Sequence, residues 1–136
     1  KILVNSREAG NNIIASADYT IHRPMAERLG VPLWEFQGDW SMHTKSVLVD
    51  HDLSIIGSFN FDPRSAYLDT ELMLAVFSRE LNAQLAENMD SLWDQSLRWQ
   101  SGAYAEGGTS PKTASFGKMA LITLLSPFVS LVRFLV

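Results

Sequence analysis

Short apolar runs of strand length alternate in this chain with segments of helical periodicity, and this alternation constrains the fold more than any other feature. Two segments place apolar residues three and four positions apart, and we expect helices at Asn11–Gly30 and from Arg79 to about Trp99. We expect strands at Lys1–Val4, Val31–Phe36, Thr44–Val49, Leu53–Phe61 and Thr70–Phe77. A chain that alternates strands and helices in this way builds a mixed α/β fold.

Composition removes several classes of protein. The chain has 136 residues, which is enough for one moderate core. Its composition, with 46% hydrophobic and 19% charged residues, excludes intrinsic disorder. Its net charge of −4 has the wrong sign for a chain that binds nucleic acid by neutralising phosphates, so we expect no nucleic-acid partner. Because there is no cysteine, a disulfide framework, a thiolate zinc site and a thiol nucleophile are all excluded.

The C-terminal part differs in composition from the rest. After a folded domain at about residues 1–100, residues 101–118 are rich in Gly, Ser, Thr and Pro and are expected to form a flexible linker. Residues 119–136 then carry only one charge, on Arg133, and their length is close to the lower limit for crossing a membrane. We expect a membrane-associated tail, with packing onto the missing half of the protein as the alternative.

The residues that carry chemistry follow one spacing, H-x-K-x4-D-x6-G-S-x-N. Its members are His43, Lys45, Asp50, Gly57, Ser58 and Asn60. Residues two apart on a strand point the same way, so the first two share one face, and so do the last two. If the two strands pair as a hairpin, these side chains can converge.

Such a cluster suits a phosphoryl group. Lys45 supplies compact positive charge, while Ser58 and Asn60 donate hydrogen bonds. His43 is the one member that can attack phosphorus or exchange a proton near neutral pH. A carboxylate on its other ring nitrogen would orient it, and Glu71 on the following strand is our candidate.

This spacing resembles the HKD signature of the phospholipase D superfamily. The flanking segments GSFNFDPRSAYLDTEL, ILVNS and PLWEFQGD resemble the C-terminal half of bacterial cardiolipin synthases, particularly the C-type group, and the resemblance covers about residues 1 to 100. In that group an Asn commonly precedes the Thr-Glu pair, whereas this chain has Asp69.

The resemblance implies a phospholipase D-like α/β sandwich, with a mixed sheet flanked by helices, in which two HKD halves share one active site. One histidine attacks the phosphodiester to form a phosphohistidine, and the other protonates the leaving alcohol. By position His43 would be the general acid and base. Lys45 and Asn60 match the phosphate-binding positions of the family, and Ser58 matches a supporting one. Glu71 matches the carboxylate behind the histidine.

The same resemblance implies a phosphatidyltransferase that makes cardiolipin from a phosphatidylglycerol-like lipid at the bacterial cytoplasmic membrane, held peripherally or by its tail. Asp50 would have a largely structural role in the motif, as a turn residue. The chain has one HKD motif, so the second would come from the same full-length chain or from a second copy. No metal or cofactor is required. The alternatives are a phospholipase D-type hydrolase and a non-catalytic membrane-docking fragment.

Overall fold

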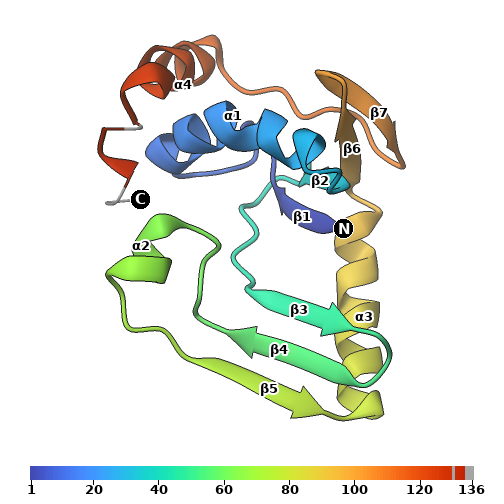
Figure 1. Cartoon of the computed structure of the whole chain (residues 1–136). Helices are drawn as coiled ribbons and strands as arrows, with labels where there is room; N and C mark the ends of the chain where they lie inside the picture. Colours follow the sequence, from blue (N-terminus) through green and yellow to red (C-terminus); the bar gives the residue numbers. More distant parts are fainter. Residues whose placement is uncertain (130, 134–136) are drawn as a thin grey trace. The chain divides into compact units, whose positions relative to one another are not determined.

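The computed structural model describes residues 1–129 and 131–133, and it divides the chain into two compact units (Figure 1). The first unit comprises Lys1–Met42 and Leu92–Val132, and the second is built around residues 43–91. Each unit has its own β-sheet and at least one helix. The expected mixed α/β fold is therefore confirmed.

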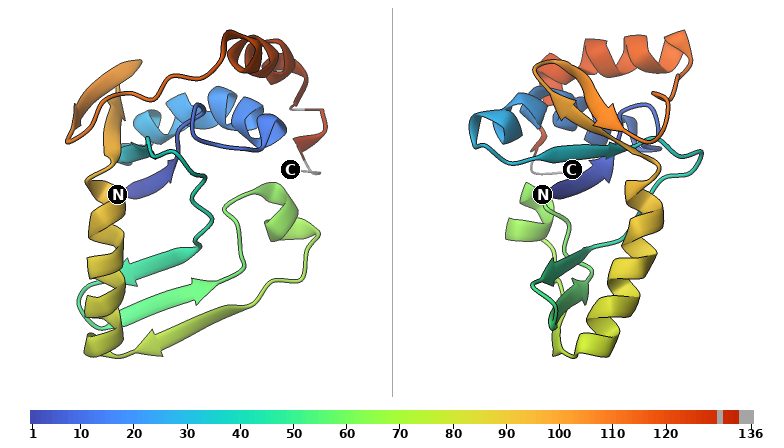
Figure 2. Two further views of the ribbon diagram at one scale, coloured as in Figure 1. Left: turned by 180° about the vertical axis from the view of Figure 1, so that it is seen from behind. Right: turned by 90° about the vertical axis from the view of Figure 1, so that its right-hand side faces the viewer.

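The first unit contains a four-stranded sheet of order β1-β2-β6-β7. The first two strands are parallel because a helix returns the chain between them, and the other neighbours are antiparallel. Two helices of this unit, α1 and α4, lie side by side (Figure 2). The elements are β1 (Ile2–Asn5), α1 (Ile13–Arg28), β2 (Leu33–Phe36), β6 (Ser96–Gln100), β7 (Ala103–Gly107) and α4 (Phe116–Val129).

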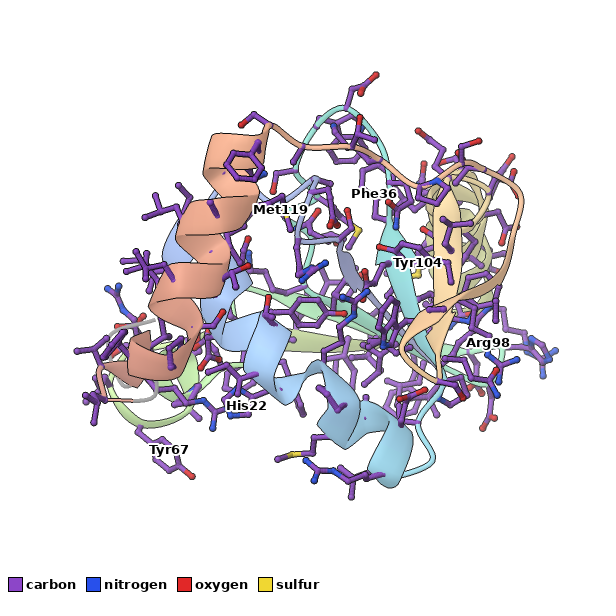
Figure 3. The ribbon with its side chains drawn as sticks, turned by 90° about the horizontal axis from the view of Figure 1, so that it is seen from above. His22, Phe36, Tyr67, Arg98, Tyr104 and Met119 are labelled. Atoms are coloured by element: carbon purple, nitrogen blue, oxygen red, sulfur yellow. The ribbon has the colours of Figure 1, made fainter. Side chains whose placement is uncertain are left out.

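The contact between α1 and α4 is the apolar core of the first unit. Helix α1 begins after Asn12, whose side chain accepts two backbone N–H bonds of the first turn. Ala17 of α1 is fully buried against Ile122 and Val129 of α4. Met119, labelled on α4 in Figure 3, packs at the edge of the same core. Burying Ile122 and Val129 each stabilises this contact by about 1.5–3 kcal/mol.

A buried polar cluster joins α1 to the sheet of the first unit. Glu35 of β2 is completely buried, and its carboxylate forms an ion pair with Arg23 of α1 at 2.6 Å. The hydroxyls of Tyr19 and Tyr104 donate to the same carboxylate at 2.6 and 2.8 Å. Burial raises the pKa of both tyrosines, and it raises the pKa of Glu35 against the opposing effects of Tyr19, Arg23 and Tyr104. The charges of the pair are thus compensated where water does not reach them.

The second unit contains a three-stranded antiparallel sheet of order β3-β4-β5. Its first two strands form a hairpin that turns at residues 50–52, where Asp50 has a positive φ of 52°. The side-chain amide of Asn82 donates to the backbone carbonyl of Leu53 at 2.9 Å and fixes a helix against the sheet. The elements are β3 (Ser46–Val49), β4 (Leu53–Gly57), α2 (Pro63–Tyr67), β5 (Met73–Phe77) and α3 (Arg79–Trp93).

The expectation of a helix continuing to about Trp99 is wrong. Helix α3 ends at Trp93, and the hydroxyl of Ser96 donates to the carbonyl of Leu92 at 2.6 Å, which satisfies a carbonyl left free at the helix end. The chain then runs along β2 as strand β6.

The segment 101–118, expected to be a flexible linker, contains strand β7 and the beginning of α4. Strands β6 and β7 form a hairpin whose two turn residues, Ser101 and Gly102, have φ values of 52° and 81°. Two consecutive positive φ values match the right-handed twist of paired strands, and this explains the tight hairpin.

The expected tail, residues 119–136, is helical in α4 as far as Val129. Ser130 and residues 134–136 of that tail lie outside the described residues. Over the ranges 1–129 and 131–133, no helix combines the length and the hydropathy that crossing a membrane requires.

Candidate functional site

Apart from Asp50, the motif residues lie at one end of the β3–β4 hairpin. The backbone N–H of Gly57 donates to the carbonyl of Lys45 at 3.1 Å, which extends the strand pairing by one step beyond Ser46 and Ile56. The segment 43–45 therefore runs beside the segment that begins at residue 57. This confirms the hairpin on which the expected convergence of the motif depends.

His43 and Lys45 lie just before β3 rather than within it. The His43 side chain is exposed, and the Lys45 ammonium folds back to donate to the carbonyl of His43 at 3.2 Å. Throughout the described part of the chain, no hydrogen bond reaches the His43 ring. Its imidazole is accessible for chemistry, with the ammonium of Lys45 tethered to the same stretch of backbone.

Gly57 fits this position because its neighbour leaves no room for a side chain. A Cβ atom at residue 57 would overlap the carbonyl oxygen of Leu72, to which the next residue, Ser58, donates its N–H at 3.0 Å. A larger residue would push β4 and β5 apart at the point where the motif loop begins.

Glu71 lies at the centre of a hydrogen-bond network directly before β5. One carboxylate oxygen accepts a short hydrogen bond from the Ser58 hydroxyl, and the other accepts from the Ser65 hydroxyl at 2.7 Å. The Ser58 hydroxyl also accepts the N–H of Leu72 at 3.1 Å. The structure thus connects Glu71 to the G-S-x-N loop, and the expected bond to His43 stays a prediction.

The electrostatics of Glu71 follow from this network. Its pKa is lowered, chiefly by the hydrogen bond from Ser58 and then by that from Ser65, with a smaller contribution from the positive charge of Lys45. Burial opposes this effect only in part. The group is therefore a carboxylate at neutral pH, and its lowered pKa makes it a poor general base.

Ser65 belongs to this network and was not predicted from the sequence. It lies in α2 and is only 5% exposed, and its hydroxyl also accepts the backbone N–H of Asn60 at 3.2 Å. Asp62 caps α2 and accepts the N–H of Ser65 at 2.8 Å. The signal that could have revealed it is the run Asp62-Pro63, typical of a helix start, shortly after the motif.

Two other acidic residues of the region lie apart from the Glu71 network. Asp50 occupies the hairpin turn, at the opposite end of β3 from Lys45, in the turn position that the sequence predicted for it. Asp69, which replaces the usual Asn, forms an exposed ion pair with Arg64 at 3.0 Å. Residues 1–129 and 131–133 contain no group of His, Asp or Glu side chains placed to hold a metal ion.

Comparison with known proteins gives a consistent result. Residues 1–93 match the family model described as "Cardiolipin synthase, PLD-like domain". An uncharacterized protein of Helicobacter pylori is 26% identical over 85% of this chain and 28% of its own length. Cardiolipin synthase A of Escherichia coli is 44% identical over 45% of this chain and 12% of its own length. The chain therefore spans well under half of either relative.

Solved structures share the fold. Phosphatidylserine synthase of Haemophilus influenzae covers 99% of this chain with a TM-score of 0.69 and 17% identity, and this chain covers 35% of it. Nuc of Salmonella typhimurium, a phospholipase D family member, covers 74% of this chain with a TM-score of 0.53 and 24% identity, and this chain covers 63% of it. The family match over residues 1–93 and these folds agree, and the chain belongs to the PLD-like domain family of cardiolipin synthase.

Proposed function

We propose that this chain supplies one of two HKD halves of a phosphatidyltransferase that transfers a phosphatidyl group between phospholipids. The observation that carries the proposal is the hairpin end at which His43 and Lys45 run beside the G-S-x-N loop, in a chain of the cardiolipin synthase family. The names of the relatives add support, since a cardiolipin synthase acts on phospholipid. The second half comes from the full-length chain or from a second copy.

In the proposed reaction, a histidine of the other half attacks phosphorus, and the bond from phosphorus to the leaving alcohol breaks. His43, as general acid, gives its proton to that leaving oxygen. The acceptor alcohol then loses its proton to His43 and attacks phosphorus, and the phosphorus–nitrogen bond breaks. Lys45 and the side-chain amide of Asn60 compensate the negative charge on the phosphoryl oxygens.

The predicted hydrogen bond from Ser58 to a phosphate competes with a bond that Ser58 already makes in this structure. Its hydroxyl proton points to Glu71, and its N–H donates to the carbonyl of Leu72. A hydroxyl has one proton to donate. Ser58 therefore donates to a phosphate only when its hydroxyl turns away from Glu71, whereas Lys45 has donors beyond its bond to the His43 carbonyl.

We also propose that α4 attaches the protein peripherally to the cytoplasmic membrane. Its inner face packs on α1, but Phe116, Leu124 and Phe128 on the outside are 88%, 66% and 61% exposed and line a shallow apolar groove. After Glu106 the sequence has three basic residues and no acidic one, although the whole chain has a net charge of −4. Lys112 is ion-paired with Asp39, and Lys118 donates to the backbone carbonyls of Glu8 and Gly10. The exposed apolar face of α4 is therefore what supports peripheral attachment to phospholipid.

The test of transfer uses the full-length enzyme that carries this chain, with labelled phosphatidylglycerol in mixed vesicles. Substituting His43→Ala is expected to lower turnover by about 10²- to 10⁴-fold, the usual contribution of general acid–base catalysis. The matched control is His51→Ala, which removes another exposed histidine at the opposite end of the same hairpin and is expected to leave turnover unchanged. Cardiolipin production that survives His43→Ala would refute the proposal, and release of phosphatidic acid instead would identify a hydrolase.

A further inference from the structure

Ser65 connects three separate pieces of the loop that follows β4. Its hydroxyl donates to Glu71 at 2.7 Å and accepts the backbone N–H of Asn60 at 3.2 Å. Its own backbone N–H donates to Asp62 at 2.8 Å. With only 5% of its surface exposed, Ser65 exchanges these partners for water less readily than an exposed serine would.

The protons of this network all point in one direction. Each serine hydroxyl has a single proton, and both Ser65 and Ser58 direct theirs to Glu71. Each hydroxyl oxygen in turn accepts a backbone N–H, from Asn60 in one case and from Leu72 in the other. An ionised Glu71 suits this arrangement, because both of its oxygens then accept and neither has a proton of its own to place.

We propose that Ser65 is a positioning residue. Its hydroxyl links the Glu71 carboxylate to the Asn60 backbone, and this link fixes the loop that carries Ser58 and Asn60. The two hydrogen bonds of the Ser65 hydroxyl are sufficient evidence for this link. Its importance for turnover rests on the proposed function, in which Asn60 binds the phosphoryl group.

The chain contains a matched pair outside the site. The Ser78 hydroxyl donates to Glu80 at 2.9 Å and accepts the N–H of Leu81 at 3.2 Å, so it makes the same two kinds of bond as Ser65. The pKa of Glu80 is lowered first by a backbone hydrogen bond within Glu80 itself and then by the hydrogen bond from Ser78. A Ser78→Ala variant therefore shows what the loss of such a hydroxyl does where no catalytic role is proposed.

The first experiment follows the side-chain carboxyl carbons of Glu71 and Glu80 by NMR during an acid titration of this chain. Substituting Ser65→Ala is expected to raise the pKa of Glu71 and leave that of Glu80 in place, while Ser78→Ala does the reverse. If the Glu71 pKa does not move in Ser65→Ala while the Glu80 pKa responds to Ser78→Ala, the proposal is overturned.

The second experiment measures turnover in the full-length enzyme. Ser65→Ala is expected to lower kcat on the order of tenfold to a hundredfold, because a displaced loop misplaces the phosphate donors, and Ser78→Ala is expected to leave kcat unchanged. Equal turnover of Ser65→Ala and the unaltered enzyme would overturn the positioning role. If the unaltered enzyme has no transferase activity, the proposed function is refuted. The link from Ser65 to Glu71 and Asn60 is not, because the titration tests it independently.

One measurement needs no variant and covers the case in which Ser65→Ala does not fold. In the unaltered chain, the amide of Asn60 is expected to exchange its hydrogen more slowly than that of its neighbour Phe61, whose side chain is 97% exposed. Exchange at Asn60 as fast as at Phe61 would show that the bond to Ser65 does not persist in solution and would overturn the proposal.

Discussion

A carboxylate that accepts two hydroxyl hydrogen bonds accepts them more weakly once it gains a proton, because the charge that strengthens them is gone. Glu71 is in this position, since both of its oxygens accept from serines and its pKa lies below the ordinary value of 4.5. For a group whose pKa is lower in the folded state, the stabilising contribution is present above the unfolded pKa and is lost as the pH falls through the folded one. The loop around Glu71 should therefore loosen only in acid.

This behaviour can be measured at a single amide. We expect protection of the Leu72 N–H, which donates to Ser58, to decline as the pH falls from the ordinary pKa of glutamate through the lowered pKa of Glu71. Hydrogen exchange, corrected for its intrinsic pH dependence, reports the change. In Glu71→Gln the side chain does not titrate, so protection should be lower at neutral pH and no longer depend on acid. An identical acid dependence in both proteins would contradict the role given to Glu71.

At the residue scale, the sequence predicted the secondary structure around the motif better than it predicted the hydrogen-bond partners of its residues. The convergence of the motif depends on a hairpin between the two strands, and the structure confirms that hairpin. The sequence did not indicate Ser65, because the run Asp62-Pro63 marks the start of a short helix but does not show that a serine of this helix reaches Glu71. The partner of Glu71 depends on where α2 brings a hydroxyl, and that is a tertiary contact.

At the scale of elements, the sequence predicted strands and helices well where their periodicity is regular. The strands around the motif are shorter than expected, since β4 ends at Gly57 and the loop begins there. The sequence missed β6 because Leu97 and Trp99 continue the helical spacing of α3. It missed β7 because Ser101 and Gly102, which form the hairpin turn, are also typical of linkers. Pairing of β6 with β2, and of β7 with β6, decides the structure of these two segments.

Helix α4 offers a prediction at the same scale. If its outer face binds lipid, the double substitution Phe116→Ser and Leu124→Ser should weaken binding to vesicles of phosphatidylglycerol and phosphatidylcholine by at least about tenfold, because it removes two apolar side chains from the membrane interface. Both residues are exposed in the structure, so folding should be preserved. Co-sedimentation with the vesicles measures the change.

The control for α4 is Phe77→Ser, which removes an equally apolar side chain, 78% exposed, from strand β5. It is expected to bind vesicles as the unaltered chain does. Equal weakening by both changes would indicate non-specific hydrophobic adsorption, and no weakening by the α4 substitutions would remove this helix from the membrane-binding surface.

At the scale of the whole molecule, the proposed site residues and the buried ion pair lie in different units. The motif, its loop and the Glu71 network all belong to the second unit, while the buried ion pair of Arg23 and Glu35 belongs to the first. All four tryptophans, Trp34, Trp40, Trp93 and Trp99, are in the first unit. Tryptophan fluorescence therefore reports chiefly the unfolding of the first unit, with Trp93 at the end of α3 also sensitive to that helix, and amide exchange in the loop reports the second unit.

This separation makes the buried pair testable without interference from the site. Arg23 is 5% exposed and Glu35 is completely buried, so Arg23→Met leaves a buried carboxylate without its cation. The free energy of unfolding of the first unit should fall by about 3 kcal/mol or more. Urea unfolding followed by tryptophan fluorescence measures this, with Trp99, over which the guanidinium lies at 3.1 Å, as a local reporter.

The double variant Arg23→Met and Glu35→Leu distinguishes the value of the pair from the cost of an orphaned charge. Removing both charges should restore most of the lost stability, because well-packed apolar residues often replace a buried ion pair at little or no cost. Recovery will be incomplete to the extent that Tyr19 and Tyr104 lose the carboxylate to which their hydroxyls donate. A double variant as unstable as Arg23→Met alone would mean that packing of the arginine over Trp99, and not charge compensation, is what stabilises α1 on the sheet.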